Sequence, residues 1–136
     1  MKGPIRVSVK CPSCGESLMD SNALIDYLPS IKLEATVADQ VGHINLSQVY
    51  GSFNKAFSGV RDIEGSITEF ACPHCHEPFP IQKTCSCDAP MVGLHMQVGG
   101  FLKFCTRNSC EEHSMEFENP EDMYLLFKYQ DETGYA

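Results

Sequence analysis

The chain has 136 residues, of which 43% are hydrophobic, and a formal net charge of −8 at pH 7. This length suits one ordinary domain of roughly 100 to 150 residues, or two very small ones. With only ten lysines and arginines, the chain lacks the cationic surface from which nucleic-acid-binding proteins draw most of their affinity. Composition therefore argues against a DNA- or RNA-binding role.

The N-terminal segment MKGPIRVSVK has neither the apolar stretch nor the cleavage site of a secretory signal. The longest apolar run, Met123–Phe127, is far shorter than the roughly 18 to 20 residues of a membrane span. We therefore expect a soluble, cytoplasmic protein that does not associate with membranes.

The eight cysteines fall into four close pairs. Without a secretory signal, and with two C-x2-C pairs, metal ligation is favoured over the competing disulfide framework. Zn²⁺ takes four soft or borderline ligands in a tetrahedron, so two cysteine pairs make one site. The sequence predicts two zinc sites. The pairs are Cys11 with Cys14, Cys72 with Cys75, Cys85 with Cys87, and Cys105 with Cys110.

The first and second pairs occur in the segments Cys11-Pro-Ser-Cys14-Gly15 and Cys72-Pro-His-Cys75-His76. These segments resemble the knuckles of zinc-ribbon and rubredoxin-like proteins. In that family a Cys-Pro-x-Cys turn follows a strand, and a glycine directly after it eases the turn. Gly15 matches this pattern, whereas His76 stands where the second glycine would be. The resemblance covers only the two knuckles and implies a metal-binding fold without implying a reaction.

Between the two knuckles the sequence predicts an inserted subdomain, at about residues 16–66. Its start, Asp20–Leu28, predicts a short helix, because Leu24, Ile25 and Leu28 have helical spacing. Pro29 would end this helix.

A β-hairpin is predicted next, because Ile31–Val37 and His43–Tyr50 alternate apolar and polar residues. Residues Ala38–Gly42 would join the two strands. The glycine-containing segment Gly51–Gly65 predicts a loop with one short strand near Val60–Ile63.

The third and fourth cysteine pairs flank a second predicted hairpin. Cys87 and Cys105 are separated by the roughly 15 to 20 residues typical of a ribbon hairpin. Between them, Val92–Val98 alternates apolar and other residues, Gly99-Gly100 supplies a turn, and Phe101–Cys105 forms the returning strand. Cys85 and Cys87 would point to opposite faces of a strand, so we expect a tight turn there.

Four cysteine pairs can combine into two sites in three ways. We favour joining the two similar knuckles, because the hairpin then closes the other site. This grouping places Cys11, Cys14, Cys72 and Cys75 in the first site and Cys85, Cys87, Cys105 and Cys110 in the second. The alternative joins the second knuckle to the Cys85 pair and leaves the first knuckle with the Cys105 pair. A histidine could also replace a cysteine, the candidates being His113, His74 and His76.

The C-terminal segment predicts a helix. Asn119 can cap it, Pro120 suits its first position, and the acidic residues that follow favour the positive end of the helix dipole. The helix would be apolar around much of its girth, which suggests either docking on the core or binding of a partner. The residues concerned are Met123, Tyr124, Leu126, Phe127, Tyr129 and Gln130.

The sequence contains no HExxH, Walker-type or dinucleotide-binding motif. If all eight cysteines ligate, both metals are four-coordinate and have no position for water or substrate. We therefore predict a β-rich α+β protein, not an enzyme, with zinc-ribbon knuckles and an inserted hairpin in residues 1–80. Residues 81–136 would hold the second four-cysteine hairpin site and the helix.

The predicted function is that of a zinc-binding accessory or interaction protein, a small subunit that docks on a larger protein or enzyme complex. One alternative is rubredoxin-like electron transfer with iron at the first site, because a tetrathiolate accepts iron as well as zinc. Another is nucleic-acid binding through Lys103, Arg107, Tyr50 and Phe53, which the acidic charge disfavours.

Overall fold

The computed structural model describes residues 5–117 and 119–132, and this part of the chain forms ten strands and one helix. The strands are β1 (Val9–Lys10), β2 (Met19–Ile25), β3 (Leu28–Val37), β4 (Gln40–Leu46), β5 (Lys55–Ser58), β6 (Thr68–Ala71), β7 (Ile81–Thr84), β8 (Pro90–Met96), β9 (Phe101–Cys105) and β10 (His113–Glu116). The helix is α1 (Pro120–Glu132). The predicted β-rich class is confirmed.

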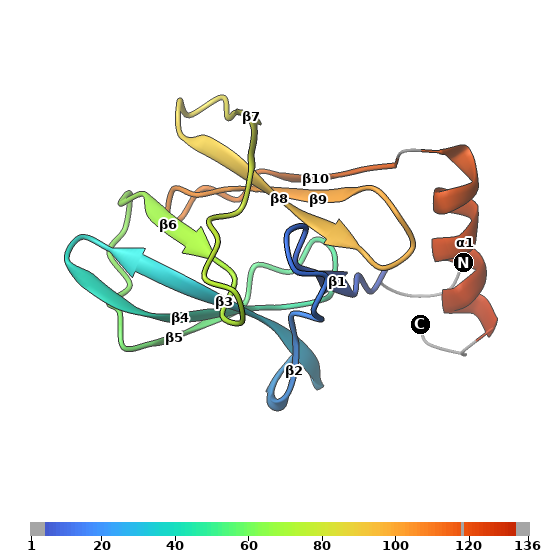
Figure 1. The fold of residues 1–136 in the computed structure, drawn as a ribbon, viewed down its shortest axis with the longest axis horizontal. Helices are drawn as coiled ribbons and strands as arrows, with labels where there is room; N and C mark the ends of the chain where they lie inside the picture. The colour runs from blue at the N-terminus through green and yellow to red at the C-terminus, as the bar shows by residue number, and fades with distance from the viewer. Residues whose placement is uncertain (1–4, 118, 133–136) are drawn as a thin grey trace.

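The strands form two antiparallel sheets, which lie as two layers in Figure 1. The first sheet has the order β2-β3-β4-β5, with β6 also on β3. The second has the order β1-β8-β9-β10, with β7 also on β8. Each sheet therefore combines strands that are far apart in the chain, since β1 joins β8 and β6 joins β3.

One apolar core contains residues of both sheets, with side chains from β3 of the first sheet and from β8 and β9 of the second. Several of its residues are almost completely buried, including Val9, Leu18, Ile31, Leu33, Leu94 and Met96. The core contains residues on both sides of position 80, and the predicted division into segments 1–80 and 81–136 stays a prediction.

Both predicted hairpins are confirmed. In the first, β3 pairs with β4 from Ile31–Leu46 to Val37–Gln40, so its turn is only Ala38 and Asp39. Its second strand is Gln40–Leu46, and not the predicted His43–Tyr50. In the second, β8 pairs with β9, and Met91 lies opposite Cys105. The expected tight turn at Cys85 is also present, because the amide of Asp88 donates to the carbonyl oxygen of Cys85 at 2.9 Å.

The helix predicted over Asp20–Leu28 is wrong, because this segment forms β2, a turn and the start of β3. Its polar groups find partners across the sheet. The hydroxyl of Ser30 donates to the carbonyl oxygen of Ala23 at 2.6 Å, and the Asn45 amide donates to Ser30 at 2.9 Å and to Asp20 at 3.3 Å. These long-range hydrogen bonds favour the strand over the local helical preference.

The short strand predicted near Val60–Ile63 is also wrong. The strand in this region is β5, which begins at Lys55 and pairs with β4. Val60 is instead a buried residue of the core. Its side chain is buried although the residues on either side of it are exposed, so its apolar character reflects one core contact and not a strand.

The predicted C-terminal helix is confirmed as α1, which lies beyond one end of the sheets in Figure 1. The Asp122 amide donates to the carbonyl oxygen of Asn119 at 3.0 Å, and the Asp122 carboxylate accepts from the Asn119 amide at 3.3 Å. Leu126 is 4% exposed, whereas Met123 is 44% and Leu125 is 49% exposed. The side chains of Phe127, Tyr129 and Gln130 lie outside the described residues.

Within the part of the chain that the structure describes, α1 falls short of the length and apolar character needed to cross a membrane.

Candidate metal centres

The two Cys-Pro-x-Cys segments fold into the same turn. The amide of Gly15 donates to the carbonyl oxygen of Cys11 at 3.0 Å, and the amide of His76 donates to that of Cys72 at 2.9 Å. Gly15 has a φ of 77° and His76 a φ of 64°. His76 thus occupies the left-handed conformation that glycine adopts without strain, which explains why the two sequences can form one turn geometry.

The first cysteine group brings the two turns together. Its Sγ atoms lie 3.8 Å apart for Cys11 and Cys75, and 3.8 Å apart for Cys14 and Cys72. All four sulfurs are within 4.8 Å of one another. A tetrahedron with Zn–S bonds of about 2.3 Å has edges of about 3.8 Å. The sulfur positions therefore fit a tetrahedral metal site.

Main-chain amides point at two of these sulfurs. The amides of Ser13 and His74 donate to the sulfurs of Cys11 and Cys72, each at 3.3 Å, and the amide of Cys75 donates to Cys72 at 3.5 Å. Such bonds stabilise thiolates. Burial nevertheless raises the pKa of Cys72 to about 12 in the metal-free protein, so a bound metal has to displace the proton of this thiol.

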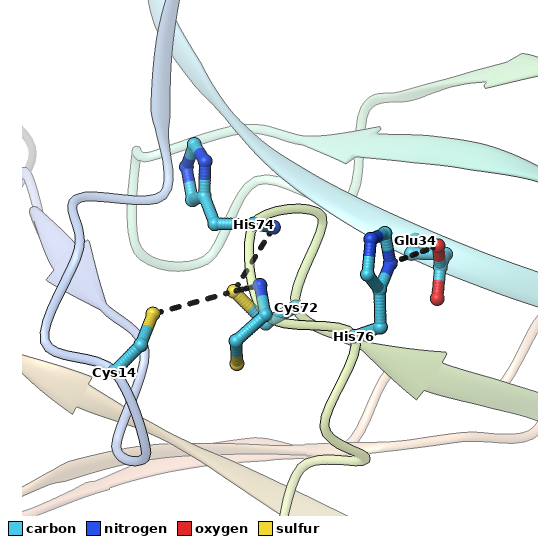
Figure 2. Close-up of polar contacts among 6 residues, drawn as sticks. Cys14, Glu34, Cys72, His74 and His76 are labelled. Atoms are coloured by element: carbon cyan, nitrogen blue, oxygen red, sulfur yellow. Dashed lines mark hydrogen bonds and ion pairs between the residues drawn. The ribbon is translucent and has the colours of Figure 1, made fainter.

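The candidate histidines have other partners. Figure 2 shows the His74 ring pointing away from the sulfurs of Cys14 and Cys72, and its Nε2 lies 3.0 Å from the carbonyl oxygen of Ser17. His76 turns to Glu34, with Nδ1 2.9 Å from a carboxylate oxygen. His113 packs against aromatic rings. Among the described residues, neither four-cysteine group includes a histidine.

The second group joins the turn after β7 to the end of β9 and the loop that follows. The Sγ atoms of Cys85 and Cys110 lie 3.7 Å apart, and those of Cys87 and Cys105 lie 3.4 Å apart. These four sulfurs are also within 4.8 Å of one another. All eight cysteines are free, and a disulfide would need an S–S distance of about 2.05 Å. The sulfurs of both groups are therefore not joined as disulfides in this structure.

Both the side chain and the main-chain amide of Arg107 form hydrogen bonds at the second cysteine group. Its guanidinium donates to the carbonyl oxygens of Gly65 at 2.9 Å and Cys87 at 3.3 Å, and its amide donates to the sulfur of Cys105 at 3.4 Å. Hydrogen bonds from the amide of Ala89 and from the side chain of Arg107 lower the pKa of Cys87 to about 6. These hydrogen bonds favour the thiolate form of Cys87, which is the form that binds a metal.

Glu112 is a second neighbour of this group that sequence reasoning missed. Its carboxylate accepts from the hydroxyl of Ser86 at 2.7 Å and from the sulfur of Cys85 at 3.1 Å. These hydrogen bonds from Ser86 and Cys85 lower the pKa of Glu112. The only available signal was its position two residues after Cys110, which does not by itself distinguish it from a solvated acidic residue.

The two groups differ in their surroundings. Cys11 and Cys72 belong to the main core, whereas Cys85 and Cys105 form a separate small cluster with Ala89 and Met91. Loss of the first group would therefore affect the core of the molecule, and loss of the second a smaller region.

The structure brings the cysteines together in the grouping that the sequence favoured, as two four-sulfur sets of tetrahedral dimensions suited to metal binding. Protein-family models, curated proteins and solved structures were each compared with this chain, and no match was found.

Proposed function

We propose that this protein is a non-catalytic zinc-binding accessory protein that uses two zinc-ribbon-like sites to hold its shape and docks on a larger protein or enzyme complex. The observation that carries the proposal is that each group places four cysteine sulfurs within 4.8 Å of one another, as a tetrahedral four-thiolate site requires. A metal held in this way has no open position for water or substrate. Zinc would instead cross-link the segments of the chain that contain its four cysteine ligands.

The positions of the first group support a structural role. Cys11 directly follows β1 in the second sheet, and Cys72 directly follows β6 in the first sheet. A metal ion here would join the two sheets at one point of the core. The second group would join the turn after β7 to the loop after β9.

Two features of the surface support binding to a protein. Apolar side chains of α1 are exposed at Met123, Tyr124 and Leu125. Both cations that were candidates for nucleic-acid binding have contacts within the chain, since Lys103 forms an ion pair with Glu116 at 2.6 Å and Arg107 donates to main-chain carbonyls. A protein surface therefore fits as the partner better than a phosphate backbone.

Purification of the native protein from its own cells, followed by native mass spectrometry, tests this proposal. The expected result is a defined complex with a stoichiometric partner. A protein that elutes as a monomer with no stoichiometric partner would contradict the docking role.

Electron transfer at the first site is a second candidate function. Iron accepts the same four-thiolate tetrahedron as zinc. Cys14 is solvent-exposed, and such exposure favours exchange of electrons with a partner. An iron site would give a coloured protein that loses its visible absorption on reduction.

A further inference from the structure

A groove of about 420 Å³ opens between the two sheets, next to the second cysteine group. Leu46 and Lys55 line it from the first sheet, and Leu102, Phe104 and His113 line it from the second. Its volume falls in the range of roughly 300 to 1,000 Å³ that is usual for ligand sites. The proposed zinc sites do not use this space.

The groove has an apolar floor and an aromatic wall. Val7 and Ile31 form part of the floor and are almost completely buried. In the wall, the ring of His113 lies 4.5 Å from that of Tyr50 and 4.7 Å from that of Phe53, measured between centroids. Phe53 is 40% exposed, so one aromatic surface remains available to an occupant.

The loop that contains Tyr50 and Phe53 is held in place by one carboxylate, that of Asp26. Asp26 accepts from the hydroxyls of Ser47 and Ser52, each at 2.6 Å, and from the amide of Asn54 at 2.7 Å. These three hydrogen bonds lower the pKa of Asp26. Because the loop is already ordered, an occupant would bind without ordering it first.

The rim of the groove is acidic. Asp62, Glu111 and Glu112 line it, against one amine, that of Lys55. The Lys55 amine donates to Asn108 at 3.2 Å. Cys105 and Cys110 of the second cysteine group also line the groove, and a zinc ion held by the four thiolates of that group would add two negative charges. The groove therefore favours a cationic occupant.

Two edge strands border the groove, since β5 ends the first sheet and β10 ends the second. The amide of Cys105 donates to the carbonyl oxygen of Glu112, and His113 is the next residue, paired with Phe104. In an antiparallel pair of strands, a residue next to a hydrogen-bonded pair has its own N–H and C=O pointing away from the partner strand. The His113 carbonyl accordingly accepts from the Tyr50 hydroxyl at 3.4 Å. An extended chain suits a site between two sheet edges.

We propose that this groove binds an extended segment of a partner protein in which a lysine or arginine stands next to an apolar side chain. The apolar side chain would contact the floor, and the cation would lie against Phe53 and beside Glu111. Cation–aromatic contact and charge complementarity both favour this arrangement. This inference rests on the proposed docking function and names the chemistry of its partner.

Binding of two short labelled peptides to the full-length, zinc-loaded protein tests the groove directly by fluorescence anisotropy. One peptide alternates lysine and leucine, and the other alternates glutamate and leucine. The expected result is saturable binding of the first peptide, weakened by salt, and no binding of the second. Equal binding of both peptides would overturn the proposal.

Matched variants test whether the peptide binds in the groove. Phe53→Ala should weaken binding about tenfold through loss of the cation–aromatic contact, and Glu111→Gln should weaken it by a similar factor through loss of the opposite charge. Glu111 is preferred to Asp62 because Asp62 accepts a hydrogen bond from Asn108. The controls are Tyr27→Ala, at a side chain that is 96% exposed, and Glu69→Gln, because neither residue lines the groove. Equal losses in variants and controls would overturn the assignment.

A photo-crosslinking residue at position 53 or 124, used in native extract, separates this inference from the docking function. Crosslinks from position 53 that map to a basic segment of the partner would support the groove. Crosslinks from position 124 alone, or from position 53 to a segment without lysine or arginine, would overturn the groove and leave docking in place. Absence of crosslinks from both positions would overturn both.

Discussion

The two knuckle turns differ at the residue that follows their second cysteine. Gly15 and His76 have nearly the same positive φ, although only glycine adopts this conformation without cost. A side chain at position 15 would meet no atom within 4 Å. The cost of a substitution there is therefore confined to the backbone conformation.

The first prediction follows from this comparison. Gly15→Ala should lower the free energy of unfolding by about 1 kcal/mol, the usual cost of a left-handed non-glycine residue. His76→Gly should raise it by a smaller amount, because the exposed contact with Glu34 is lost at the same time. Chemical denaturation of the metal-loaded proteins measures both. Changes of the same sign would contradict the shared turn geometry.

Protonation of the thiols gives a second prediction. Because burial raises the pKa of Cys72 to about 12, this thiol holds its proton at neutral pH until a metal displaces it. Raising the pH lowers the cost of removing that proton, so the apparent affinity for Zn²⁺ should rise with pH. Competition with a chromophoric chelator at several pH values measures this affinity. An affinity that does not change with pH would contradict the assignment of Cys72 as a ligand.

The two cysteine groups belong to different clusters of buried residues. The first lies in the core that both sheets share, whereas the second holds together the ends of β7 and β9. Metal binding should therefore stabilise two regions of unequal size.

This difference predicts unequal effects of removing one ligand from each group. Cys14→Ser should lower the metal content by about one ion and destabilise the whole molecule, because a structural zinc site contributes to folding directly. Cys87→Ser should also lose about one ion, but increase hydrogen exchange mainly around β7 and the loop after β9. Unchanged melting and metal content in either variant would refute that site.

The neighbouring residues Leu125 and Leu126 allow a matched test of how α1 packs against the rest of the protein. Leu126 is buried and Leu125 is half-exposed. Truncating a buried leucine costs about 2 kcal/mol or more, so Leu126→Ala should speed amide exchange in α1 by about 30-fold. Leu125→Ala should leave it nearly unchanged. Equal effects of the two substitutions, measured by hydrogen-exchange mass spectrometry, would show that the helix does not dock through Leu126.

Some elements could be predicted from local patterns and others could not. The hairpin of β8 and β9 follows from its alternating residues and its Gly99-Gly100 turn, and α1 follows from its capping residues. The segment of β2 has helical spacing, and the hydrogen bonds of Ser30 and Asn45 that make it a strand come from other parts of the chain. β5 has no alternating pattern, because most of its residues are exposed.

The chain crosses between the two sheets in a way that local sequence patterns do not reveal. β1 pairs with β8, and β6 pairs with β3, so the two knuckles approach each other from different sheets. The grouping of the cysteines could be predicted from the sequence, because two similar Cys-Pro-x-Cys turns suit one shared site. The groove could not be predicted, because it is formed by residues that are brought together only when both sheets are in place.

We propose that two zinc ions, one at each four-cysteine group, hold this fold together. Elemental analysis of the purified native protein, with a visible absorption spectrum of the same sample, identifies the bound metal. We expect about two zinc ions per chain, one for each group, and a colourless solution. Iron with a reducible chromophore, or a folded protein without bound metal, would contradict it.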